Sequence, residues 1–214
     1  MRFVFGLLLF TFIVGPGATA SAHTDVVRNQ TQPAASNFMQ IYGNAPAPLG
    51  FVRFCEQNPN QCQTKGPESR MELTSEHVQE LEDINKYVNA IITPSSDKDL
   101  YGVREYWAVP SDRGDCEDYA LLKQKLLVER GWPTSTLLLT VVRDDLGDGH
   151  AILTVRTHEG DIILDNKVDE LRVWNATSYK YIMRQSYLNP KVWISLDPSD
   201  AKLPVSIAGT QTLK

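Results

Sequence analysis

The sequence lacks an excess of basic residues, a second long apolar run and any internal repeat, and each absence excludes a class of protein. Of its 214 residues, 21 are Lys or Arg and 26 are Asp or Glu, so the formal net charge is −5. A mildly acidic chain without a basic cluster does not suit nucleic acid or an anionic membrane as partner. After residue 14 no apolar stretch approaches the ~20 residues of a membrane-spanning helix, so we expect the processed chain to be soluble.

The one long apolar run has the layout of a targeting segment. Met1-Arg2 gives a positive start, Phe3 to Val14 is almost unbroken in its apolar character, and Gly15-Pro16-Gly17 ends it. Small residues follow at 18–22, where a signal peptidase would cleave. We therefore expect a signal peptide at residues 1–22 and a periplasmic or secreted protein, an uncleaved anchor being the alternative. The rest of the chain suits one domain.

Cysteine is scarce, with three residues at positions 55, 62 and 116. An exported chain meets an oxidising compartment, in which structural thiols tend to pair. Cys55 and Cys62 flank Asn58-Pro59-Asn60, a turn-favouring run that would bring them together. A metal clip is the alternative, but it lacks further Cys or nearby His ligands, so we expect a Cys55–Cys62 disulfide. Cys116 is then unpaired, which indicates a reactive thiol or an intermolecular bridge.

Periodicity predicts two helices followed by an antiparallel meander. Apolar residues recur at helical spacing from Met71 to Ile92, where Thr74 or Ser75 can cap the helix. A second helix should begin at Asp115 or Cys116 and end at Gly131-Trp132-Pro133. β-branched, apolar runs then predict strands at residues 135–142, 151–156, 162–164 and 192–196. This order is typical of an α+β fold with helices packed on one side of a sheet.

The flanking segments carry less pattern. Residues 23–47 are rich in Ala, Asn, Gln, Pro and Ser, which is typical of a loose arm with little core of its own. We therefore divide the chain into the signal peptide, an N-terminal arm with the disulfide at 23–70, the α+β domain at 71–198 and a tail at 199–214.

Three short segments carry the residues of a thiol nucleophile and its helpers. Cys116 lies where the second helix should begin, and a helix N-terminus stabilises a thiolate. His150 opens one predicted strand and Asp165 follows the next, so neighbouring strands can hold a His–Asp pair beside the thiol. Each residue alone has a simpler interpretation, as a small buried group, a surface histidine or a turn. Their order, spacing and structural context together predict a Cys–His–Asp triad.

The motifs Gly-Asp-Cys-Glu-Asp-Tyr-Ala, Gly-His-Ala and Ile-Leu-Asp-Asn resemble the bacterial transglutaminase-like cysteine proteinase family, which includes the LapG-type periplasmic proteases. The resemblance covers roughly residues 73–193. It implies a papain-like or transglutaminase-like core with Cys116, His150 and Asp165 as the triad. It also allows for a membrane-bound regulatory protein. The segment from Cys55 to Cys62 is not among the shared motifs, so the adhesin-cleaving role of LapG-type proteases transfers less securely than the chemistry.

Acidic residues surround the predicted nucleophile. Asp115, Glu117 and Asp118 place negative charge beside a thiol that must ionise, which raises its pKa. A Ca²⁺ ion held by these three carboxylates would offset the charge, and the family resemblance implies the same ion. Helix capping is the alternative role for these acids. We interpret the acidic run at 144–149 as a solvated turn, because its spacing is not that of an EF-hand.

Aromatic residues precede the nucleophile by about ten positions. Tyr106 and Trp107 either belong to the core or form a wall of the substrate cleft, with Trp107 as a candidate substrate or oxyanion contact. The backbone amide of Cys116 is the other natural oxyanion donor.

Three functions fit this arrangement. The first is an exported cysteine endopeptidase that acts on a protein substrate. The second is a transglutaminase or amidase, in which an amine takes the acyl group from the same cysteine. The third is a non-catalytic binding module of the same fold, which a missing triad residue would indicate.

Overall fold

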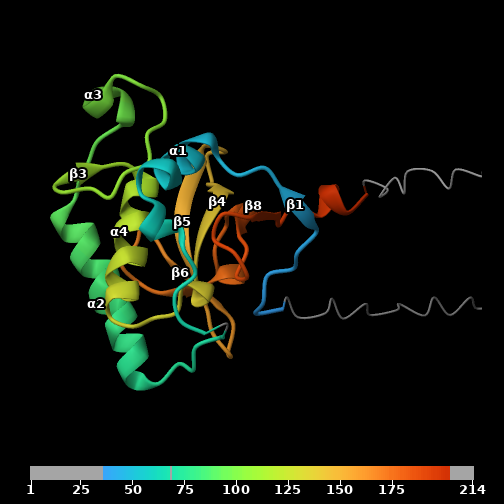
Figure 1. Cartoon of the computed structure of the whole chain (residues 1–214). Coiled ribbons are helices and arrows are strands. Elements are labelled where there is room, and N and C mark those ends of the chain that lie inside the picture. Colours follow the sequence, from blue (N-terminus) through green and yellow to red (C-terminus); the bar gives the residue numbers. More distant parts are fainter. Residues whose placement is uncertain (1–35, 68, 203–214) are drawn as a thin grey trace, which may run out of the picture. The chain divides into compact units, whose positions relative to one another are not determined.

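The computed structural model describes residues 36–67 and 69–202, all within one compact unit (Figure 1). The expected signal peptide at residues 1–22 and most of the expected tail lie outside the described residues. Among the described helices, none has the length and apolar character needed to cross a membrane.

A seven-stranded sheet in the order β1-β9-β8-β4-β5-β6-β7 forms the centre of the fold, and every neighbouring pair is antiparallel. The strands are β1 (Gly43–Ala45), β4 (Leu137–Arg143), β5 (Gly149–Arg156), β6 (Asp161–Leu164), β7 (Arg172–Val173), β8 (Lys180–Gln185) and β9 (Trp193–Ser195). A separate parallel pair joins β2 (Thr93–Pro94) to β3 (Arg113–Gly114).

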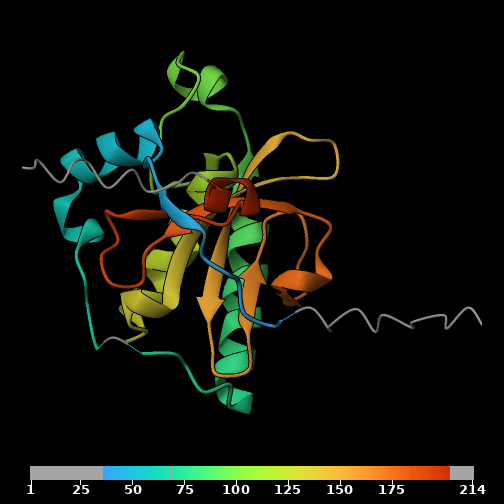
Figure 2. The same ribbon diagram turned by 90° about the vertical axis from the view of Figure 1, so that its right-hand side faces the viewer.

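Helices cover one face of this sheet, which confirms the expected α+β class. The α-helices are α1 (Leu49–Gln57), α2 (Ser75–Ile91), α3 (Asp97–Tyr101) and α4 (Cys116–Glu129). Short 3₁₀ turns are η1 (Pro59–Cys62), η2 (Thr134–Thr136), η3 (Trp174–Ala176) and η4 (Pro198–Lys202). Figures 1 and 2 show α2 and α4 lying against the sheet, with α4 packed on β5 and β4.

Alternation along the strands separates the apolar residues into two clusters. On β5, Leu153 and Val155 join the main core with residues of α2 and α4, whereas Ile152 belongs to a smaller cluster on the opposite face. This is expected of a strand, because successive side chains point to opposite faces. On α2, Leu81 and Val88 are buried at helical spacing, and Thr74 caps the helix by accepting a hydrogen bond from the His77 amide at 3.2 Å.

The segment before α2 differs from the loose arm that its composition suggests. Residues 43–45 form the edge strand β1, which pairs with β9, and α1 follows. Phe51 and Phe54 of α1 are buried in the main core. Long-range packing therefore orders a segment that is rich in polar and small residues.

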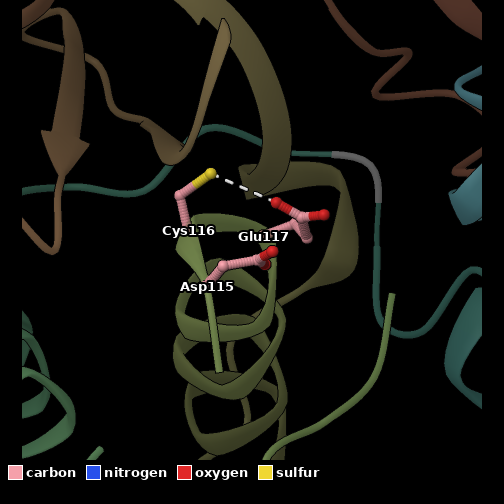
Figure 3. A group of neighbouring side chains, drawn as sticks. All are labelled: Asp115, Cys116 and Glu117. Carbon is pink, nitrogen blue, oxygen red and sulfur yellow. Dashed lines mark hydrogen bonds between the residues drawn. The ribbon is translucent and has the colours of Figure 1, made fainter. Parts of the chain in front are cut away.

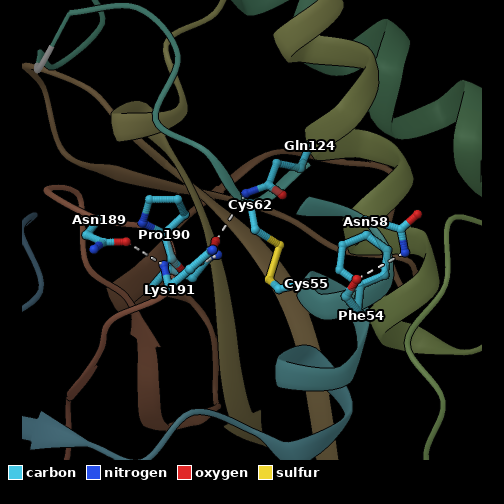
Figure 4. Close-up of a disulfide and its surroundings, with 9 residues drawn as sticks. Phe54, Cys55, Asn58, Cys62, Gln124, Asn189, Pro190 and Lys191 are labelled. Atoms are coloured by element: carbon cyan, nitrogen blue, oxygen red, sulfur yellow. Dashed lines mark hydrogen bonds between the residues drawn. A yellow bond between two sulfur atoms is a disulfide. The ribbon is translucent and has the colours of Figure 1, made fainter. Parts of the chain in front are cut away.

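The expected disulfide is present and closes this segment (Figure 4). Cys55 on α1 is bonded to Cys62 at the end of η1, with their Cα atoms 5.6 Å apart. Asn58 makes the turn between them, because both its backbone N–H and its side-chain amide donate to the Phe54 carbonyl. Both sulfurs lie in the main core, so the bridge fastens α1 to the body of the domain.

Candidate active site

Cys116 is the first residue of α4, as expected from the sequence. It is partly exposed and is the one free cysteine in the described part of the chain. The chain reaches the helix through Gly114, at which a Cβ would lie 2.6 Å from Asp118 Oδ2. Only glycine therefore lets β3 enter α4 so closely over the Asp118 carboxyl group.

The thiol of Cys116 is in an environment that favours its protonated form. It donates a hydrogen bond to Glu117 Oε2, with the sulfur and oxygen 3.1 Å apart (Figure 3). Burial raises the pKa of Cys116 strongly, and the charge of Glu117 raises it further. The backbone N–H of Ala151 acts in the opposite direction and lowers this pKa. A thiolate here thus needs a positive group. The effect of the Ala151 N–H on the thiol indicates that the sulfur lies near the start of β5, where His150 precedes Ala151.

His150 and Asp165 form a buried pair at the end of two neighbouring strands. β5 and β6 are paired with Leu153 opposite Leu164, which places Asp165 directly after β6 and near the start of β5. The distance from His150 Nε2 to Asp165 Oδ1 is 2.8 Å, and the two residues are 4% and 2% exposed. Because this bond uses Nε2, the other ring nitrogen Nδ1 is the one available to a thiol.

Further donors hold Asp165 in its ionised form. The Lys167 backbone N–H donates to Oδ1 at 3.0 Å, and the Tyr179 hydroxyl donates to Oδ2 at 2.6 Å. Burial raises the pKa of Asp165, but the bonds from His150, Tyr179 and Lys167 outweigh it, so the pKa is lower than usual. An ionised Asp165 can fix the ring of His150 and stabilise its protonated form. Tyr179 was not expected, because nothing local to its sequence marks it.

Three carboxyl groups converge beside the start of α4. Ligand oxygens of Asp97, Asp115 and Asp118 lie within 4.8 Å of one another. One oxygen on each, Asp97 Oδ1, Asp115 Oδ1 and Asp118 Oδ2, is buried without a hydrogen-bond partner among the described residues. Burial, followed by neighbouring carboxylates, raises the pKa of both Asp115 and Asp118 to about 7. Such unpartnered oxygens suit a divalent cation, which would satisfy all three together.

The expected metal ligands are therefore only partly the same as the observed cluster. Asp115 and Asp118 belong to it, while Glu117 lies in a second group with Asp115 and Cys116 and accepts the thiol hydrogen bond. Asp97 was missed. It reaches the cluster because β2 pairs with β3, which brings the start of α3 beside the start of α4. Nothing local to its sequence marks Asp97 as a member of this cluster.

Trp107 adopts the core position that the sequence left open. Its ring packs edge-on against Phe51 and lies near Trp193, with ring centroids 5.6 and 6.2 Å away. The indole Nε1–H donates to Glu105 at 3.0 Å, and the residue is 4% exposed. Since that donor is already engaged, the Cys116 amide is the better candidate for contact with an oxyanion.

The acidic turn between β4 and β5 is more than a solvated loop. Asp144 accepts from Lys167 at 2.6 Å, and Asp145 accepts from Ser178. Lys167 is two residues after Asp165, and Ser178 is next to Tyr179. The turn that precedes His150 is therefore bonded both to the segment that carries Asp165 and to the segment that carries Tyr179.

Comparison with known proteins gives one family and several solved structures. A family model described as bacterial transglutaminase-like cysteine proteinase matches residues 41–201. A structure of LapG from Legionella pneumophila is 26% identical, with a TM-score of 0.44 and 50% of this chain covered. The chain spans 62% of the length of that LapG chain. A calcium-bound LapG structure is 23% identical, with a TM-score of 0.48 over 60% of this chain and 74% of that one. A search of curated sequences gave no match.

Proposed function

This chain belongs to the bacterial transglutaminase-like cysteine proteinase family, and on that premise we propose that it is an exported cysteine endopeptidase using Cys116, His150 and Asp165. The observation that carries the proposal is the buried His150–Asp165 pair, 2.8 Å apart, at the start of the strand β5 against which α4 packs with Cys116 as its first residue. A buried imidazole fixed by a carboxylate next to a helix-terminal thiol is the arrangement that nucleophilic catalysis requires.

The reaction follows from the positions of these groups. The proton of Cys116 passes to His150, and the sulfur attacks a peptide carbonyl carbon. The carbonyl oxygen becomes negative and is met by the backbone N–H of Cys116 at the start of α4. His150 then gives its proton to the departing amine, leaving a thioester on Cys116. Water, deprotonated by His150, attacks this thioester, releases the acid and restores the thiol. Asp165 holds the imidazole throughout.

We also propose that Ca²⁺ binds at Asp97, Asp115 and Asp118. The support is the set of three buried, unpartnered carboxylate oxygens, since all-oxygen carboxylate sites suit a hard cation. Glu117 lies next to this cluster, and its carboxylate would become a fourth ligand if it released its hydrogen bond from the Cys116 thiol. When bound, the ion supplies positive charge that offsets the acids around Cys116. The chain's own contribution is to hold the ligands through the Ala108 and Tyr106 amides, which donate to Asp118 and Asp97.

Export is part of the proposal. The apolar run at residues 3–14 has the layout of a signal peptide, and the Cys55–Cys62 disulfide suits an oxidising compartment. We therefore place the mature protein in the periplasm or outside the cell, where a protein substrate would be met. A membrane-bound regulatory partner stays a prediction from the family resemblance.

The proposed triad is tested without knowing the substrate, through the rate at which iodoacetamide alkylates Cys116. An unperturbed thiol has a pKa of about 8.5, and burial with nearby acids raises that of Cys116. Fast alkylation at neutral pH therefore requires His150. We expect His150→Ala to slow alkylation at least tenfold, and Cys116→Ala to remove the label altogether. His158→Ala, in the turn at the opposite end of β5 from His150, is the matched control. Equal rates in His150→Ala and the parent protein would refute the triad.

A further inference from the structure

Tyr179 contacts both members of the His–Asp pair. Its hydroxyl donates to Asp165 Oδ2 at 2.6 Å, while His150 Nε2 and the Lys167 amide use Oδ1. Both oxygens of the carboxylate are thus engaged, and its rotation is prevented. The Tyr179 ring also packs edge-on to the His150 ring, with centroids 5.7 Å apart and an interplanar angle of 74°.

The segment that carries Tyr179 is held in place on either side. Ser178 donates to Asp145 on the turn that precedes His150. On the other side, the Thr177 and Tyr181 hydroxyls are hydrogen-bonded at 2.9 Å, and Tyr181 is buried in the cluster on the sheet face that carries Ile152. The phenol of Tyr179 is therefore presented to Asp165 by a braced turn rather than by a loose chain.

We propose that Tyr179 is a positioning residue of the triad, which orients Asp165 so that Asp165 in turn holds His150 toward Cys116. The inference rests on the proposed triad. Burial and the hydrogen bond to Asp165 raise the pKa of Tyr179, so the phenol remains a donor at neutral pH. The other ionisable side chains whose charges act on or respond to Asp165 are Lys123 of α4 and Tyr181 of β8. Neither forms a hydrogen bond to it among the described residues.

The test uses Tyr179→Phe, which removes the hydroxyl and keeps the ring. Tyr42→Phe is the matched control, because it makes the same chemical change at a hydroxyl that donates to Gln40 and takes no part in holding Tyr179. The readout is the iodoacetamide alkylation rate of Cys116 across pH, measured with calcium chloride and with EDTA. Thermal unfolding of each variant reports on stability separately.

We expect Tyr179→Phe to slow alkylation at neutral pH about tenfold, as the loss of one hydrogen bond to a charged group implies, and to move the pH profile upward. Tyr42→Phe should leave the alkylation rate and its pH profile unchanged. In an Asp165→Asn background, Tyr179→Phe should have no further effect, because it acts only through Asp165.

Two outcomes separate this inference from the triad itself. If His150→Ala is slow but Tyr179→Phe alkylates like the parent protein, the positioning role is wrong and the triad stands. If His150→Ala is as fast as the parent protein, the triad fails first. Equal slowing by Tyr179→Phe in the parent protein and in the Asp165→Asn background would also overturn the inference, because the tyrosine would then act by another route.

Discussion

Replacing Asp118 by asparagine should raise the stability of this protein without calcium and weaken its stabilisation by calcium. Asp118 is fully buried, and its Oδ1 accepts from the Ala108 amide at 2.8 Å. Its Oδ2 is unpartnered among the described residues and lies in the cluster with Asp97 and Asp115. Asparagine keeps the oxygen that Ala108 needs and places an amide donor at the unpartnered position. It therefore removes one buried negative charge with little change of shape.

The magnitude follows from the pKa of Asp118, which rises from 3.8 to about 7, with burial as the largest cause. Between these values the folded state binds more protons than the unfolded state, so without metal the stability falls as the pH rises from about 4 to about 7. A rise of about three pKa units at about 1.4 kcal/mol each corresponds to roughly 4 kcal/mol, as an order of magnitude. In EDTA at neutral pH, Asp118→Asn should regain part of this lost stability and unfold several degrees above the parent protein.

Calcium should stabilise the parent protein much more than it stabilises Asp118→Asn. A ligand at a hundred times its dissociation constant stabilises by about 2.7 kcal/mol, which raises the midpoint of a domain of this size by about 5–10 °C. The parent protein should show this shift and Asp118→Asn much less of it, while Mg²⁺ should substitute poorly. Differential scanning calorimetry in EDTA and in calcium chloride measures both effects. Asp112→Asn, an exposed acid on the same segment, is the control.

Either of two results would rule out the calcium site at Asp118. One is an equal calcium shift in the parent protein and in Asp118→Asn. The other is a parent protein with no calcium binding by titration calorimetry, which would leave helix capping as the role of these acids.

The remaining predictions concern other parts of the site and the fold. Cys116→Ala, His150→Ala and Asp165→Ala should each nearly abolish turnover, and their kinetic effects should be non-additive, because the three act as a unit. Gly114→Ala should weaken calcium binding measured by titration calorimetry, since its Cβ would lie 2.6 Å from Asp118 Oδ2; affinity equal to that of the parent protein would contradict the close approach. Reducing the Cys55–Cys62 bridge should cost at the low end of ~2–4 kcal/mol, and hydrogen exchange should rise in α1 and η1 before β4 and β5. Free thiols at both Cys55 and Cys62 in a non-reduced peptide map would contradict this disulfide.

Local patterns were enough to predict the elements that carry the triad. α2 has its Thr74 cap within the segment itself, both helices have their apolar spacing and terminating residues there, and the start of α4 was predicted to within a residue. The strands that hold His150 and Asp165 are consecutive and joined by short turns, which makes their pairing local in sequence. For the same reason the Cys55–Cys62 bridge could be predicted from the turn between its cysteines.

Elements ordered by distant contacts could not be predicted in this way. β8 lies in the middle of the sheet between β4 and β9, but its sequence carries polar residues at several positions. Its Arg184 is buried because it pairs with Asp161 of β6 at 3.2 Å, a contact that no local pattern reveals. Asp97 and Tyr179 also depend on distant contacts. Asp97 reaches the site only when β2 pairs with β3, and Tyr179 only when β8 pairs with β4.

The most direct test of the central claim is to incubate the mature protein with exported proteins in calcium chloride and map new protein termini by mass spectrometry. The Cys116→Ala protein serves as the matched control, because it lacks the thiol and retains the rest of the site. The proposed function predicts new internal termini with the parent protein that are absent with Cys116→Ala. The same termini appearing with Cys116→Ala would contradict the claim that Cys116 is the nucleophile of a cysteine endopeptidase.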